Sequence, residues 1–137
     1  MTYVSTEIRR AVRERASGCC EYCLRSQQDI RLPYHAEHIL PVQHGGTTTL
    51  DNLALSCPDC NAYKGPNIGS YDNGAFAPLY NPRTQKWQEH FLLQDELIQP
   101  LTAEGRVTIG LLQLNQNEYL LERKVLIALN RYPCQVK

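Results

Sequence analysis

Two pairs of cysteines with the same spacing carry the strongest chemical signal in this sequence of 137 residues. Cys20 and Cys23 form one Cys-x2-Cys pair, and Cys57 and Cys60 form the other. A turn of this spacing directs two thiolates to one tetrahedral ion, and two such turns complete a four-cysteine zinc site. We therefore predict that these four cysteines bind a structural Zn²⁺, against the alternative that they are buried free thiols.

The two other cysteines have weaker claims to a role. A Cys19-x3-Cys23 pair is conceivable, but the spacing from Cys20 matches the second pair and is favoured. Cys134 has no evident partner near the C-terminus, and we expect a free thiol there. The N-terminal residues lack the apolar stretch of a secretory signal, so we expect a cytoplasmic protein. In that reducing compartment, cysteines are more often metal ligands or free thiols than disulfides.

A second set of chemically capable residues lies in and just after the segment between the two cysteine pairs. His38 offers a base whose unperturbed pKa is about 6.5, suited to activating water at neutral pH. Glu37 offers a hard anionic oxygen, and Asn61 offers a side-chain carbonyl oxygen beside a zinc ligand. Oxygen ligands completed by water molecules suit Mg²⁺ or Mn²⁺. These residues predict metal-dependent hydrolysis of a phosphodiester.

The order and spacing of these elements resemble the HNH endonuclease family. Over residues 20–65 the chain contains Cys-x2-Cys, Glu-His-Ile-x-Pro, Gly-Gly, Asp-Asn-Leu and Cys-x2-Cys-Asn-x2-Lys in that order. The resemblance implies a ββα-metal fold with a four-cysteine zinc, and hydrolysis of DNA that leaves 5′-phosphate and 3′-hydroxyl ends. It also implies that His38 is the general base and Glu37 a metal ligand, and that the Asn52 amide braces the loop that orients His38.

The chain departs from the family name at the third position, where Asn61 stands in place of a histidine. Asparagine is a familiar variant there, and its oxygen can still bind Mg²⁺. The departure therefore disfavours Ni²⁺ and Zn²⁺ as the catalytic ion more than it threatens activity. Lys64 follows one helical turn later and either contacts a phosphate oxygen or merely complements the helix C-terminus.

Each of these residues also has an ordinary structural alternative. His38 could be a core histidine bonded to a backbone carbonyl, Glu37 a surface carboxylate, and Asn61 a helix-capping residue. His35 shares the strand face of Glu37, where a packing or edge role is favoured. His44 flanks the glycine turn, where an exposed loop position is favoured over a phosphate contact. The alternative function is a non-catalytic zinc ribbon that binds nucleic acid or protein, which would not need Glu37, His38 and Asn61 together.

The elements that must position these residues are short. Residues 34–42 are predicted to be extended and residues 53–56 to return as a strand, giving a hairpin with a long loop. A helix is predicted over residues 58–64, with a proline at its first turn. Residues 5–17 predict another helix with Ser5 as its N-cap.

The C-terminal extension, residues 67–137, is predicted to be mainly helical. Residues 67–83 are rich in Gly, Pro, Asn and Tyr and predict an irregular connector. Trp87, His90 and Phe91 have helical spacing and are predicted to fasten the extension to the motif core. The segment 102–114 is ambiguous, and a helix is favoured.

Residues 117–130 predict a clearer helix. Its apolar face consists of four side chains: Leu121, Val125, Ala128 and Leu129. We thus expect a single α+β domain over residues 1–137, with a zinc-clamped ββα-metal core at 18–66 and helical extensions at both ends.

The overall charge and hydropathy limit the partners. The 14 basic and 14 acidic residues balance, which counts against a tight, nonspecific coat on nucleic acid. No apolar run is long enough to cross a membrane. We expect the motif helix to lie against the minor groove and backbone of double-stranded DNA, which gives weak sequence specificity.

Overall fold

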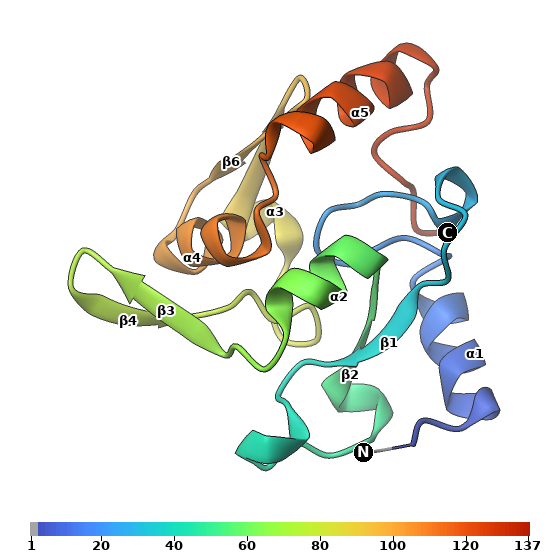
Figure 1. The fold of residues 1–137 in the computed structure, drawn as a ribbon, viewed down its shortest axis with the longest axis vertical. Helices are drawn as coiled ribbons and strands as arrows, with labels where there is room; N and C mark the ends of the chain where they lie inside the picture. The colour runs from blue at the N-terminus through green and yellow to red at the C-terminus, as the bar shows by residue number, and fades with distance from the viewer. Residues whose placement is uncertain (1–2) are drawn as a thin grey trace.

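A computed structural model describes residues 3–137 and shows a mixed α+β fold (Figure 1). Its centre is an antiparallel hairpin of β1 (His35–His38) and β2 (Leu53–Ser56). Helix α1 (Thr6–Arg15) lies along this hairpin, and helix α2 (Pro58–Lys64) follows β2 directly. The predicted hairpin and the helix after it are confirmed.

Strand β2 is buried on both faces, because its side chains alternate between two apolar clusters. Leu53 and Leu55 pack with Val12 of α1. Ala54 lies in the other cluster, together with the four cysteines of the two pairs and apolar residues of the C-terminal extension. The hairpin is therefore held between the N-terminal helix and the rest of the chain.

The N-terminal helix and the loops have the expected local signals. The Ser5 hydroxyl accepts a hydrogen bond from the Ile8 N–H at 3.2 Å, which confirms the predicted N-cap. Short 3₁₀ turns occupy parts of the segments before and after β1: Gln27–Asp29, Val42–His44 and Leu50–Asn52.

The C-terminal extension contains two further hairpins, so the prediction of a mainly helical extension was incomplete. Strands β3 (Gly69–Asp72) and β4 (Ala75–Pro78) replace the predicted irregular connector over 67–83, which was wrong. The Asn73-Gly74 turn between them has φ values of 51° and 83°. Asn-Gly is the strongest sequence signal for such a two-residue turn, so the sequence contained evidence for this hairpin.

The second hairpin of the extension follows a single helical turn. Helix α3 (Trp87–His90) ends where β5 (Phe91–Gln94) begins, and β5 pairs with β6 (Leu97–Pro100). Trp87 and Phe91 pack with their ring centroids 4.9 Å apart, and Phe91 is buried. Their predicted role in fastening the extension is confirmed, since Trp87 also donates a hydrogen bond to the Tyr22 carbonyl.

Both predicted C-terminal helices are present, as α4 (Ala103–Leu112) and α5 (Asn117–Ala128). The apolar face predicted for α5 is exposed, however, while Arg123 and Leu126 are its buried residues. Arg123 is buried because its guanidinium donates to the Glu96 carbonyl at 2.7 Å and to the Asn115 side chain at 2.9 Å. Helical periodicity identifies a face but not the surface that covers it.

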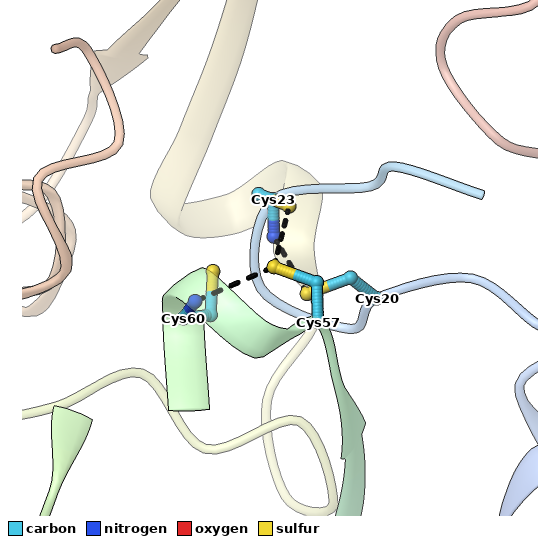
Figure 2. Close-up of side chains that lie close together, drawn as sticks. All are labelled: Cys20, Cys23, Cys57 and Cys60. Carbon is cyan, nitrogen blue, oxygen red and sulfur yellow. Dashed lines mark hydrogen bonds between the residues drawn. The ribbon is translucent and has the colours of Figure 1, made fainter. Parts of the chain in front are cut away.

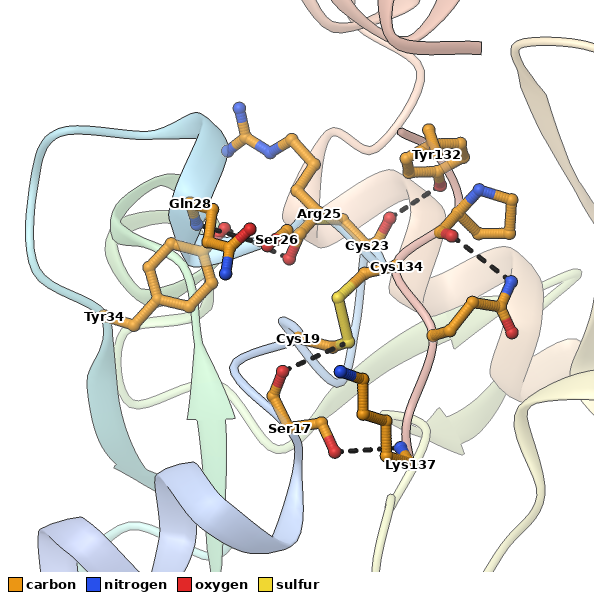
Figure 3. The surroundings of a disulfide bond; sticks show 12 residues. Ser17, Cys19, Cys23, Arg25, Ser26, Gln28, Tyr34, Tyr132, Cys134 and Lys137 are labelled. Carbon is orange, nitrogen blue, oxygen red and sulfur yellow. Dashed lines mark hydrogen bonds between the residues drawn. A yellow bond between two sulfur atoms is a disulfide. The ribbon is translucent and has the colours of Figure 1, made fainter. Parts of the chain in front are cut away.

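The last residues of the chain return to the first cysteine pair (Figure 3). Cys134 forms a disulfide with Cys19, 115 residues earlier in the sequence, so the prediction of a free thiol was wrong. The Cys134 N–H also donates to the Leu24 carbonyl at 2.9 Å. A partner this distant could not be inferred from cysteine spacing. Within residues 3–137, no helix combines the length and apolarity needed to cross a membrane.

Candidate functional site

The two cysteine pairs converge in the interior of the fold (Figure 2). The sulfur atoms of Cys20, Cys23, Cys57 and Cys60 all lie within 4.8 Å of one another, and all four residues are buried. The Cys23 and Cys57 sulfurs are 3.7 Å apart. A tetrahedral ion with zinc–sulfur bonds of about 2.3 Å would require sulfur separations of about 3.8 Å. The predicted set of cysteines is thus brought together in a geometry that fits Zn²⁺.

A buried arginine balances part of the negative charge that four thiolates would carry. Arg25 donates to the Cys57 sulfur at 3.2 Å and to the carboxylates of Asp59 and Glu122 at 2.7 and 2.8 Å. Four thiolates around Zn²⁺ leave a net negative charge, which a buried guanidinium stabilises. No sequence pattern identifies Arg25, because its partners on α2 and α5 lie far along the chain.

His38 ends β1, and its ring contacts the loop that follows. Its Nε2 lies 2.9 Å from the Thr48 hydroxyl. Burial lowers the pKa of His38 below its ordinary value of 6.5, and the nearby charge of Lys64 lowers it further. At neutral pH the ring is therefore mainly neutral, which is the form that can accept a proton. Thr48 was missed, since nothing in its spacing distinguishes it from the threonines on either side.

Lys64 joins the end of α2 to β1. Its ammonium donates to the His38 carbonyl at 2.9 Å and lies 3.4 Å from Glu37 Oε1. The Lys64 side chain is 1% exposed and that of Glu37 is 16% exposed. Burial raises the pKa of Glu37, an effect that the charge of Lys64 opposes. The pair thus holds a partly desolvated carboxylate near the backbone of His38.

Asn52 ties together the two ends of the loop after β1. Its Oδ1 accepts from the Leu40 N–H at 2.9 Å, and its Nδ2 donates to the Leu40 and Thr47 carbonyls at 3.0 and 2.8 Å. Gly46 is required in this loop because an added Cβ would collide with the Leu40 carbonyl oxygen. These bonds restrain the backbone that leads from His38 to Thr48.

Asn61 lies on α2 three residues before Lys64 and is half-buried. Among the described residues, its side chain makes no hydrogen bond, and Glu37 Oε2 likewise has no partner. Among the described residues, the buried Tyr22 hydroxyl also has no hydrogen-bond partner. Burial raises the pKa of Tyr22, and the negative charge of Glu37 raises it further. The oxygens of Glu37 and Asn61 that have no partner are hard donors, the type of ligand that Mg²⁺ prefers.

Hydrogen bonds connect some of the predicted site residues and not others. Lys64 connects Glu37 to the His38 backbone, but no hydrogen bond within residues 3–137 joins the His38 ring directly to the Glu37 carboxylate or the Asn61 amide. His35 and His44 are both exposed, on β1 and in the loop after it.

Comparisons with known proteins give a family match and a distant relative. The model of the HNH endonuclease family matches residues 20–67, which include both cysteine pairs and the residues around His38. The chain is 25% identical over 122 residues to the Septu protein PtuB of Bacillus thuringiensis, a match that covers 88% of this chain. The chain spans 46% of the length of that relative. No solved structure matches the chain. From the family match and the converging cysteines, we conclude that the chain carries an HNH endonuclease domain over residues 20–67.

Proposed function

We propose that the protein is a divalent-metal-dependent endonuclease that hydrolyses phosphodiester bonds of DNA. The observation that carries this proposal is the link that Lys64 makes between the Glu37 carboxylate and the His38 backbone within the HNH domain. Duplex DNA is bound mainly through its backbone, with weak sequence specificity. Cleavage leaves 5′-phosphate and 3′-hydroxyl ends.

In this proposal, His38 is the general base that takes a proton from the attacking water. The Thr48 hydroxyl holds the ring through Nε2, and Asn52 holds the backbone between His38 and Thr48. Because the ring at the end of β1 is held by the braced loop that follows, the base keeps its orientation when DNA binds.

Glu37 and Asn61 are the residues that would hold Mg²⁺ or Mn²⁺. When bound, such an ion stabilises negative charge on the phosphate and on the leaving 3′-oxygen. Lys64 keeps the Glu37 carboxylate in place and uses two of its three N–H donors for protein oxygens. Because 1% of its side chain is exposed, Lys64 is proposed to position Glu37 and the His38 backbone and not to contact a phosphate oxygen.

Zn²⁺ is proposed to have a structural role only. Four cysteines fill a tetrahedral coordination sphere, which leaves no position for water or substrate. The ion would join the turn before β1 to the start of α2 and so fix the base of the nuclease hairpin.

Cleavage of a supercoiled plasmid tests the proposal. Wild-type protein with Mg²⁺ or Mn²⁺ is expected to relax or linearise the plasmid, and His38→Ala is expected to lower the rate at least a hundredfold. His44→Ala is the matched control, because His44 is an exposed histidine six residues later. If wild type and His38→Ala leave the plasmid equally intact while DNA still binds, the protein is a non-catalytic zinc module.

A further inference from the structure

A cavity of about 470 Å³ opens beside the candidate nuclease site. Ile39 and Leu40, which directly follow His38, form one wall together with Lys64. The opposite wall comes from the β3–β4 hairpin and the segment after it, including Phe76. Since Lys64 also contacts Glu37 and the His38 carbonyl, one side chain connects the cavity to the candidate catalytic groups.

The lining of the cavity combines apolar walls with unused amide donors. Its apolar part includes Ile39, Phe76 and Tyr80, and its polar part includes Asn81 and Gln85. Gln85 uses its side-chain oxygen to accept from the Asn81 N–H, and Asn81 uses its own to accept from Arg83. Neither side-chain NH₂ group has a partner among residues 3–137. A flat ring with acceptor atoms on its edge matches both parts.

Phe76 is presented as an aromatic platform. It is 52% exposed, although it lies in the middle of β4. Its ring covers Gly69 on the paired strand, where an added Cβ would approach Phe76 Cζ to 2.6 Å. The Tyr71 ring packs against it in a T-shaped arrangement with centroids 5.9 Å apart. The ring is therefore held in place while much of its surface stays free.

We propose that this cavity binds an unpaired nucleobase of the DNA strand, adjacent to the phosphate that is cut, with the base stacked on Phe76. This inference rests on the proposed nuclease function and refines its substrate to duplex DNA with an unpaired nucleotide. Paired bases are stacked on each other and cannot enter a cavity, whereas an unpaired base can stack on an aromatic side chain.

Binding without cleavage tests the inference. Fluorescence anisotropy would compare His38→Ala protein, in Mg²⁺, on three labelled DNAs: an intact duplex, the same duplex with two unpaired nucleotides, and that duplex with abasic sites at those two positions. The DNA with unpaired bases is expected to bind at least fivefold more tightly than the others. Adding Phe76→Ala is expected to remove this preference, and Phe76→Trp is expected to retain it.

Leu92→Ala is the matched control, because Leu92 is 51% exposed on β5 and does not line the cavity. Equal affinity for all three DNAs, or the same preference after Phe76→Ala as after Leu92→Ala, would overturn the inference. Tighter binding of an RNA strand with the same unpaired bases would overturn the assignment to DNA. Base-dependent binding by a wild-type protein that cuts no plasmid would refute the nuclease proposal and leave the cavity assignment standing.

Discussion

The two cysteine pairs have the same spacing, but the chain positions them in different ways. The second pair lies where β2 meets α2, and local structure holds it. Cys57 is the N-cap of α2 and accepts from the Cys60 N–H at 3.3 Å, while Pro58 supplies the first helical residue. The first pair lies in a turn between α1 and a 3₁₀ turn, without a helix or strand of its own.

The C-terminal extension supplies the support that the first pair lacks. The Tyr132 hydroxyl donates to the Cys23 carbonyl at 2.7 Å, as Figure 3 shows, and the Trp87 indole donates to the Tyr22 carbonyl at 2.9 Å. The disulfide between Cys19 and Cys134 adds a covalent link. The spacing of the cysteines therefore identifies the ligands of a metal site. The second pair is held in place by a local helix, whereas the first pair is held by residues distant in the sequence.

The largest expected effect comes from removing a ligand of either pair. Cys23→Ser and Cys60→Ser should both lose stoichiometric zinc and cooperative unfolding, because the binding free energy of a structural zinc, about 10–16 kcal/mol in small domains, is also folding free energy. Metal analysis by mass spectrometry on chelator-washed protein checks this. An intact fold with no zinc in the wild type would refute the four-cysteine site.

Removing the disulfide should give the next largest loss of stability, and the link that it removes is one to the first pair. The double variant Cys19→Ser/Cys134→Ser is expected to lose about 4–5 kcal/mol of stability, since the cross-link closes a loop of 115 residues. Denaturant unfolding under oxidising conditions measures the loss, and wild type treated with a reductant should match the variant. Equal midpoints for oxidised wild type and the variant would contradict a stabilising role.

A smaller effect is expected from single hydrogen bonds between the extension and the first pair. Tyr132→Phe leaves the buried Cys23 carbonyl without this donor, which costs about 1–3 kcal/mol. Hydrogen exchange should accelerate at residues 19–25 and stay unchanged at residues 57–64. Tyr71→Phe is the control, because Tyr71 is exposed and its hydroxyl has no hydrogen bond among the described residues. Equal acceleration in both segments would show that the two pairs are not supported separately.

The smallest effect is expected from an ion pair remote from both cysteine pairs. Arg106 donates to both carboxylate oxygens of Asp72 at 2.9 Å, and this lowers the pKa of Asp72 below its ordinary value of 3.8. A carboxylate with a lowered pKa stabilises the fold above its ordinary pKa, and this stabilisation is lost as the pH falls through the lowered value. Arg106→Ala should therefore lower the melting temperature slightly at pH 7, with no difference from wild type in strong acid.

Zinc retention should not change in Arg106→Ala. A loss of zinc in this variant would mean that the extension supports the first pair as one unit and not through the particular bonds of Trp87 and Tyr132.

The sequence predicted the features that depend on neighbours along the chain. The cysteine spacing, Ser5 as a helix cap and Pro58 at a helix start act over a few residues, so they could be recognised without the fold. The Asn73-Gly74 turn was equally local, and its hairpin could have been predicted. In contrast, the partners of Arg25 and Lys64 lie on other elements, and no local pattern identifies them.

By itself, therefore, the sequence determined the four cysteines, the hairpin that carries His38, the helix that carries Asn61, and the existence of α4 and α5. Only the tertiary structure decided that Cys134 bonds to Cys19, that α5 buries Arg123 and not its leucine face, and that a cavity adjoins the candidate site. The reason is physical: turn and helix preferences act within a few residues, whereas burial and partner choice depend on which distant segments pack together.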